Sequence, residues 1–98
     1  MIRKEDLVGV WVREHTTQPS TPDFENVTTI FYEDGHSTDV FHYPDKDQIM
    51  FLTYKIDGDY LITDQPSRPR IERTKAKIEN GKLILEYEGV VSRYRKLK

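Results

Sequence analysis

The residues most capable of chemistry lie on predicted β-strands. Arg13 and His15 alternate along one of them, so their side chains lie on the same face of that strand. Four more polar candidates stand on other predicted strands: His42, Glu72, Tyr87 and Ser92. Brought together inside a β-structure, these groups would orient the polar end of a small bound molecule. The same groups would also satisfy one another at a solvent-facing rim, so a purely structural role remains open.

Catalysis and metal binding have weaker support in the same residues. His36 stands beside a predicted tight turn, at the opposite end of the fold from His15 and His42, so the three cannot share one ion. No ligand spacing singles out two histidines with Glu72, and Ser92 lacks the sharp turn that accompanies a nucleophile. The chain has no cysteine, which excludes disulfides and thiolate chemistry. We therefore expect a non-enzymatic protein without a metal or another cofactor.

Length and composition predict one domain over residues 1–98. With 36% hydrophobic and 33% charged residues, the chain suits a β-fold with one solvated and one apolar face. The net charge of -2 argues against sequence-independent nucleic-acid binding. The N-terminus is charged, and no run approaches the ~20 apolar residues of a membrane span. We expect a cytoplasmic protein with no membrane span, although a cleaved signal peptide would leave no trace.

Eight runs rich in Val, Ile, Thr, Tyr and Phe predict β-strands. They span residues 7–15, 27–33, 36–43, 48–56, 59–64, 71–79, 82–88 and 90–97. Only Ile2–Asp6 favours a short helical turn. Tight turns at Asp34-Gly35, Asp57-Gly58 and Asn80-Gly81 alternate with longer connections. In an antiparallel meander successive connections lie at opposite ends, so one end is closed by tight turns and the other carries loops.

Each tight turn also predicts the register of its hairpin. The predicted opposed pairs include Phe31 with Thr38, Tyr54 with Leu61, Ala76 with Leu85, and Leu83 with Tyr94. These registers give one mostly apolar face and place Asp39 on the other, outer face. Eight such strands can enclose their apolar face by closing into a barrel, which removes exposed edges. A sandwich of two sheets is the alternative, because alternation alone does not prove closure.

Three short motifs carry a family resemblance. Gly9-Val10-Trp11 follows the short N-terminal turn, Phe31 precedes Asp34-Gly35, and Tyr94-Arg95 lies in the last predicted strand. This combination resembles the lipocalin-like (calycin) barrels of the small bacterial type. The resemblance implies an all-β, eight-stranded antiparallel up-and-down barrel with Trp11 as the plug of its closed end. It also implies an arginine that covers the plug, with Arg95 preferred over Arg93.

The barrel predicts a function in binding a small apolar or amphipathic molecule. The predicted ligand-binding residues are Arg13, His15, His42 and Tyr87 at the polar end and Phe31, Leu52, Tyr54 and Leu85 along the apolar part. The interior of an eight-stranded barrel is only just wide enough for its own side chains, so a filled interior is the alternative structure. An open interior would place the site under the loops at 16–26 and 65–70.

A protein-interaction module is the alternative function. In that hypothesis the barrel is a scaffold, and the long loops supply the contact surface through Phe24, Arg68 and Arg70. Phe24 is an aromatic side chain in a polar loop, where exposure to water is unfavourable unless a surface covers it. The two arginines lie beside prolines and present cations that could meet an anionic partner.

Overall fold

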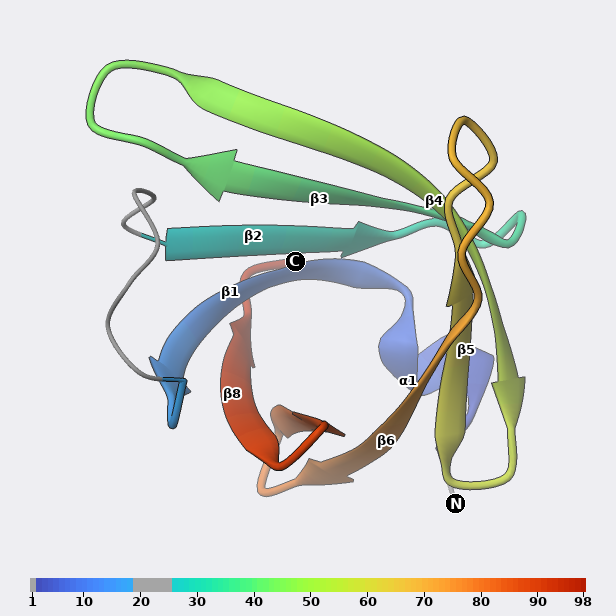
Figure 1. The fold of residues 1–98 in the computed structure, drawn as a ribbon. Helices are drawn as coiled ribbons and strands as arrows, with labels where there is room; N and C mark the ends of the chain where they lie inside the picture. Colours follow the sequence, from blue (N-terminus) through green and yellow to red (C-terminus); the bar gives the residue numbers. More distant parts are fainter. Residues whose placement is uncertain (1, 19–25) are drawn as a thin grey trace.

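The computed structural model, which describes residues 2–18 and 26–98, is an all-β closed barrel (Figure 1). Each strand pairs antiparallel with the next, and β8 returns to pair with β1, so the sandwich alternative is wrong. The elements are α1 Lys4–Leu7, β1 Gly9–Thr16, β2 Asn26–Phe31, β3 His36–His42, β4 Asp47–Asp57, β5 Tyr60–Asp64, β6 Glu72–Glu79, β7 Lys82–Tyr87 and β8 Val90–Lys96. This confirms the predicted up-and-down barrel with a short N-terminal helical turn.

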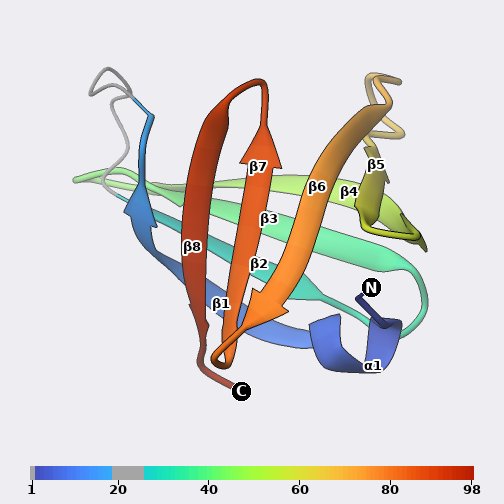
Figure 2. The same ribbon diagram turned by 90° about the horizontal axis from the view of Figure 1, so that it is seen from below.

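The β2–β3, β4–β5 and β6–β7 turns and α1 lie at one end of the barrel. Figure 2 shows α1, the β6–β7 turn and the C-terminus at that end, with the β7–β8 turn and the β5–β6 connection at the other. No helix in the described part of the chain is both long and apolar enough to cross a membrane. The closed end therefore carries short turns, whereas the looped end combines longer connections with the short β7–β8 turn.

The two C-terminal hairpins have the predicted registers. Ala76 lies opposite Leu85, and Leu83 lies opposite Tyr94. Asn80 and Glu88 have φ angles of 54° and 50°, and each is followed by a glycine with positive φ. Two consecutive positive φ angles are the type I′ geometry that matches the twist of a two-residue hairpin. The turn chemistry therefore fixes which side chains of β6, β7 and β8 enter the barrel.

The β2–β3 hairpin differs from its predicted register by one residue. Phe31 lies opposite Ser37, and Thr29 lies opposite Asp39. The Tyr32 N–H donates to the His36 carbonyl at 2.9 Å, so the loop between them holds three residues instead of two. Because strand side chains alternate, a shift of one residue exchanges the two faces of β3. The prediction that Asp39 lies outside is therefore wrong: with Ser37 it lies on the inner face.

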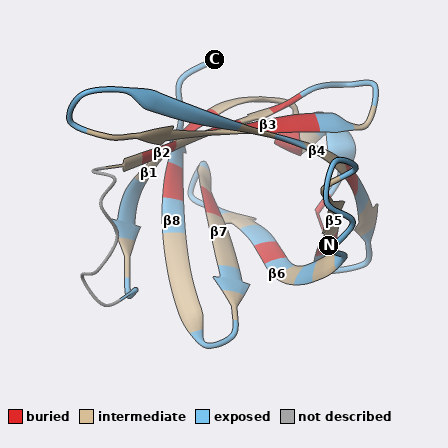
Figure 3. Ribbon diagram, turned by 45° about the horizontal axis from the view of Figure 1, so that its top comes forward, coloured by how far each residue is buried: buried red, intermediate tan, exposed pale blue. Residues whose placement is uncertain are grey.

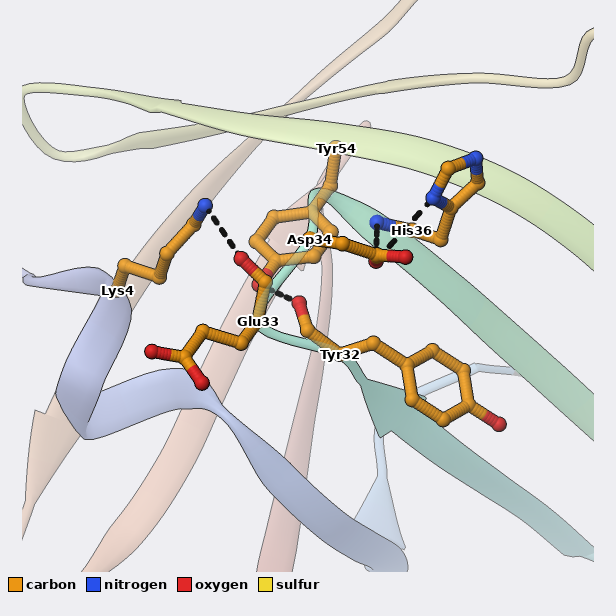
Figure 4. A network of polar contacts seen from close by, with 6 residues as sticks. All are labelled: Lys4, Tyr32, Glu33, Asp34, His36 and Tyr54. Carbon is orange, nitrogen blue, oxygen red and sulfur yellow. Dashed lines mark hydrogen bonds and ion pairs between the residues drawn. The ribbon is translucent and has the colours of Figure 1, made fainter.

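Side chains around this loop tie it to α1 and β4 (Figure 4). Lys4 Nζ donates to the Glu33 carbonyl at 2.8 Å, and the Tyr54 hydroxyl donates to the Tyr32 carbonyl at 2.6 Å. Asp34 Oδ1 accepts the His36 N–H at 3.0 Å. These bonds satisfy the loop's polar groups in the three-residue geometry, which a two-residue turn would not present in the same places.

The β4–β5 hairpin is shifted by two residues from its predicted register. Tyr54 lies opposite Thr63 instead of Leu61, because the turn is centred on Gly58 and Asp59. An even shift leaves every side chain on the face that was predicted for it. Leu52 and Leu61 therefore both lie inside the barrel, as expected, although their opposed partners differ.

The core lies at the closed end. Trp11 is only 1% exposed, and its Nε1 donates to the Leu7 carbonyl at 2.8 Å. Ile2, Leu7 and Leu83 pack in the same cluster. Figure 3 shows its buried strand segments in red on β6, β7 and β8. The indole thus joins α1 to the barrel floor, which is the place that the family resemblance implies for Trp11.

The cation over Trp11 is a lysine instead of the expected arginine. Lys96 lies opposite Trp11 in the β1–β8 ladder, and its Nζ stands 5.6 Å from the centre of the indole ring. Arg95 lies opposite Val12 and Lys82, so it points to the other face of the sheet. The resemblance located the covering strand correctly and its covering residue one position too early.

We expect Lys96→Met to lower the free energy of unfolding by about 0.5–1 kcal/mol, the usual value of an exposed cation–π contact. The matched variant Arg95→Met should change it by less than about 0.5 kcal/mol, since that side chain is exposed on the outer face. Urea unfolding followed by circular dichroism measures both values. A larger loss in the Arg95 variant than in the Lys96 variant would contradict the assignment.

Candidate ligand-binding site

A cavity of about 250 Å³ lies inside the barrel and is lined from β2 through β8. Its apolar lining residues are Phe31, Met50, Leu52, Leu61 and Leu85. Its polar lining residues are Thr29, Ser37, Asp39, Thr63, Gln65, Arg70, Glu72, Thr74 and Tyr94. Gln65 and Arg70 belong to the β5–β6 connection, which places the mouth at the looped end. The barrel's own side chains thus leave room for a small molecule.

Asp39 is a charged group of the inner wall. Its Oδ1 accepts a hydrogen bond from the Thr29 hydroxyl at 2.9 Å, across the β2–β3 ladder. Burial raises the pKa of the Asp39 carboxyl to about 6, against the lowering effect of the Thr29 bond, and the charge of Glu72 raises it further. Within the described residues, Asp39 has no ion-pair partner. The cavity therefore contains a carboxylate whose charge the protein does not neutralise.

Tyr94 stands beside Asp39 on the inner face of β8. Burial raises the pKa of the Tyr94 phenol to about 12, and the charge of Asp39 raises it further. Arg13 and a hydrogen bond with Thr29 act in the opposite direction. The phenol therefore stays neutral at ordinary pH.

Ser37 lies two residues before Asp39 on β3, so both side chains lie on the same face. It is 2% exposed, and among the described residues its Oγ is the buried side-chain polar atom without a hydrogen-bond partner. An unsatisfied buried hydroxyl costs about 1–3 kcal/mol. Ser37 lines the cavity, but its Oγ has less than 1 Å² of accessible surface, so a bound molecule could reach this hydroxyl only after rotation of the Ser37 side chain.

The mouth of the cavity carries one ion pair. Arg70 Nε and Glu72 Oε2 are 3.5 Å apart, and the Arg70 N–H donates to Asp64 Oδ1 at 2.9 Å. The Arg70 side chain is 71% exposed, so this pair contributes little to stability. Both residues of this ion pair line the cavity at its entrance.

The predicted apolar residues mostly line the interior. Phe31, Leu52 and Leu85 line the main cavity, and Tyr87 lines a neighbouring hollow of about 440 Å³ that shares Leu85 and Tyr94. Tyr54 lies in the floor instead, where its ring meets Phe31 edge-on with centroids 5.1 Å apart. A ligand-binding role for these residues stays a prediction, but their placement is compatible with it except at Tyr54.

The predicted polar residues divide into two groups. Glu72 lines the main cavity, and Tyr87 and Ser92 line the neighbouring hollow, whereas Arg13, His15 and His42 line neither. The β1–β8 register shifts between Arg13 and His15, and the irregularity ends their shared face. Arg13 stands opposite Tyr94, whereas exposed His15 stands opposite Arg93. Both line a shallow groove that also includes Asn26. The predicted polar collar of Arg13 and His15 is thus not assembled.

His42 is turned away from the cavity by the one-residue register shift of β3. Its Nε2 and the Thr28 hydroxyl are 2.7 Å apart, and its Nδ1 lies 3.0 Å from Asp47 Oδ1. Within the described chain, no group of three or more acidic or histidine side chains is arranged to hold a metal ion. His42 is instead part of a local polar cluster on the barrel surface.

The predicted partner-contact residues do not share one location in the described structure. Arg70 lines the cavity mouth, while Arg68 is exposed on the β5–β6 connection, where its N–H donates to the Gln65 carbonyl at 3.0 Å. Phe24 lies outside the described residues. The three therefore give no evidence of one continuous contact surface.

Sequence reasoning missed Asp39 and Ser37, which carry the polar chemistry of the cavity. The alternation in β3 favours neither face, since one carries His36, Thr38, Val40 and His42 and the other carries Ser37, Asp39 and Phe41. Only the loop length decides between them. A glycine in the third position of a three-residue loop, as at Gly35 with its φ of 93°, is a known hairpin pattern, so the sequence is compatible with this register as well as with a two-residue turn.

Comparison with known proteins does not assign this chain to a family. No family model, no curated protein and no solved structure matches the chain. The barrel is consistent with a calycin-like fold, and the site stands on its own residues.

Proposed function

We propose that this chain is a non-enzymatic binding protein that holds a small amphipathic molecule inside a single lipocalin-like barrel domain. The observation that carries the proposal is the cavity of about 250 Å³, in which an apolar wall faces a few polar groups. Ligand sites in proteins have this composition: mostly apolar surface with a small number of placed polar atoms. Phe31, Leu52 and Leu85 would contact the apolar part of the ligand.

The size of the cavity limits the ligand. An apolar cavity of about 150 Å³ accommodates benzene, so this one suits a molecule of about ten non-hydrogen atoms. The volume lies just below the usual range for ligand pockets, which begins near 300 Å³. Compounds with a single ring and a short side chain are therefore better candidates than long-chain lipids.

We expect Leu52→Trp to abolish uptake by filling the cavity, while Leu97→Trp, at a site 49% exposed on the C-terminal segment, leaves it unchanged. Native mass spectrometry of freshly purified protein reports any retained molecule. Calorimetric titration with 2-phenylethylamine and 2-phenylethanol then compares the two variants with the parent chain. If the Leu52 variant bound each probe as well as the parent chain does, the result would contradict an interior site.

A protein-interaction role is the second candidate. Two large apolar side chains favour it, because Ile71 is 74% exposed and Phe51 is 69% exposed on the outside of the barrel. Arg68 and Phe24 would add to such a contact surface. The cavity-filling Leu52 variant separates the two functions, since it removes uptake of small molecules and leaves the outer surface intact.

A further inference from the structure

The inner face of β3 places the Asp39 carboxylate at the cavity wall, with the buried Ser37 hydroxyl close behind the cavity surface. Asp39 Oδ1 accepts a hydrogen bond from the Thr29 hydroxyl. Ser37 Oγ has no hydrogen-bond partner among the described residues. The two positions are separated by one residue along the strand, which places their Cα atoms about 7 Å apart. A single donor group of a ligand can lie between them, with its remaining atoms against the apolar wall.

The charges around Asp39 favour a cation. On β2 and β8 it faces the neutral hydroxyl of Thr29 and the neutral phenol of Tyr94, and on β4 it lies opposite Met50. On β6 the Glu72 carboxylate adds a like charge, and Arg70 at the mouth is paired with that carboxylate. The remaining facing cation is Arg13 on β1, opposite Tyr94. None of these groups forms an ion pair with Asp39.

We infer that the ligand is a small primary amine, whose ammonium group pairs with the Asp39 carboxylate and, after rotation of the Ser37 side chain toward the cavity, donates a second hydrogen bond to Ser37 Oγ. This inference rests on the proposed function. A buried charge without a partner is unfavourable, and a partner cation removes most of that cost. An anionic head would instead meet Asp39 and Glu72, and a purely apolar ligand would leave Ser37 Oγ unsatisfied.

The same geometry makes binding depend on pH. An alkylamine stays protonated across the neutral and acidic range, so Asp39 is the group that titrates. Because the pKa of Asp39 lies near 6, its charge is present at pH 7.5 and lost as the pH falls below 6. Affinity for the amine should therefore fall by up to about tenfold per pH unit below that value. Affinity for a neutral analogue should not follow this profile.

Three probes of matched shape test the inference: 2-phenylethylamine, 2-phenylethanol and 3-phenylpropanoate, titrated calorimetrically into the full chain. At pH 7.5 we expect the amine to bind at least about tenfold more tightly than the alcohol, as for a charge-assisted hydrogen bond. In Asp39→Asn that preference should disappear, and in Ser37→Ala it should decrease. The parent chain at pH 5 provides the same comparison without any substitution.

The outcomes separate this inference from the proposed function. Equal binding of amine and alcohol, or tighter binding of the carboxylate, overturns the choice of an amine while leaving an interior site in place. An amine preference that survives both Asp39→Asn and acidification also overturns it. If none of the three probes binds and native mass spectrometry finds no retained molecule, the proposed function itself fails.

Discussion

Replacing Asp39 by asparagine should stabilise the barrel by about 3 kcal/mol at pH 8 and by less than about 1 kcal/mol at pH 4. The pKa of Asp39 rises from an ordinary 3.8 to about 6 in the folded protein, mainly through burial. A carboxyl whose folded pKa is raised opposes folding wherever it is ionised. The cost is complete above pH 6, decreases as the pH falls from 6 to 4, and vanishes when both states are protonated.

Asparagine keeps the shape of the side chain and an oxygen that accepts the Thr29 hydroxyl, so the change removes charge and little else. Urea unfolding at several pH values between 4 and 8 measures the difference. Asp34→Asn in the same hairpin is the control, because hydrogen bonds from His36 lower the pKa of that exposed aspartate. Its stability effect should have the opposite sign at pH 8. A stabilisation in the Asp39 variant that is the same at every pH would contradict the assignment.

Such a cost is informative because it lies at the cavity. Binding sites commonly contain groups that destabilise the empty protein and are satisfied by the ligand. Asp39 and Ser37 both fit that description, since one is an unneutralised carboxylate and the other an unpartnered hydroxyl. The stability measurement on Asp39 is thus independent of any ligand, yet it bears on the same carboxylate that we assign to the ammonium group.

Trp11→Ala should destabilise the barrel by about 3–5 kcal/mol, the usual range for truncating a buried aromatic residue. Trp11 is 1% exposed and joins α1 to the floor through its bond to the Leu7 carbonyl. A domain of this size has a total stability of about 5–15 kcal/mol, so the variant should lie close to unfolding at 37 °C. The measurement is urea unfolding followed by circular dichroism, because the substitution removes the only tryptophan.

Two further variants show what part of the loss comes from the indole nitrogen. Trp11→Phe keeps much of the apolar contact and leaves the Leu7 carbonyl without its donor, so it should cost about 1–3 kcal/mol. Leu97→Ala removes an apolar side chain that is 49% exposed and should cost less than about 1 kcal/mol. If Trp11→Ala cost no more than Leu97→Ala, the plug would not hold the closed end together.

The parts of the fold that sequence reasoning predicted correctly are those where turn chemistry allows one geometry. Asn80-Gly81 and Glu88-Gly89 each accept two positive φ angles, so the faces of β6, β7 and β8 followed directly. Asp34-Gly35 is compatible with both a two-residue and a three-residue loop, and the choice depends on contacts with Lys4 and Tyr54. Those contacts are remote in sequence, which is why local patterns could not supply them.

The same reasoning explains the mixed result at the candidate site. Leu52 was placed correctly because apolar alternation survives the even shift of the β4–β5 hairpin, and Leu85 because its hairpins have the predicted registers. Phe31 kept its inner face because the one-residue shift exchanged the faces of β3 and not those of β2. His42 and Asp39 exchanged faces because β3 shifted by one residue, and His15 left the face of Arg13 because the β1–β8 ladder is irregular there. No residue of β1 is distinctive enough to predict this irregularity from the sequence.

The three-residue length of the β2–β3 loop has a consequence for the lining of the barrel interior. Its length selects which of two ready-made linings β3 turns inward: an acidic one with Ser37, Asp39 and Phe41, or a basic and apolar one with Thr38, Val40 and His42. Deleting one loop residue would exchange the linings without changing any side chain in the strand. The length of this loop, as well as the identity of the strand residues, therefore determines which side chains line the barrel.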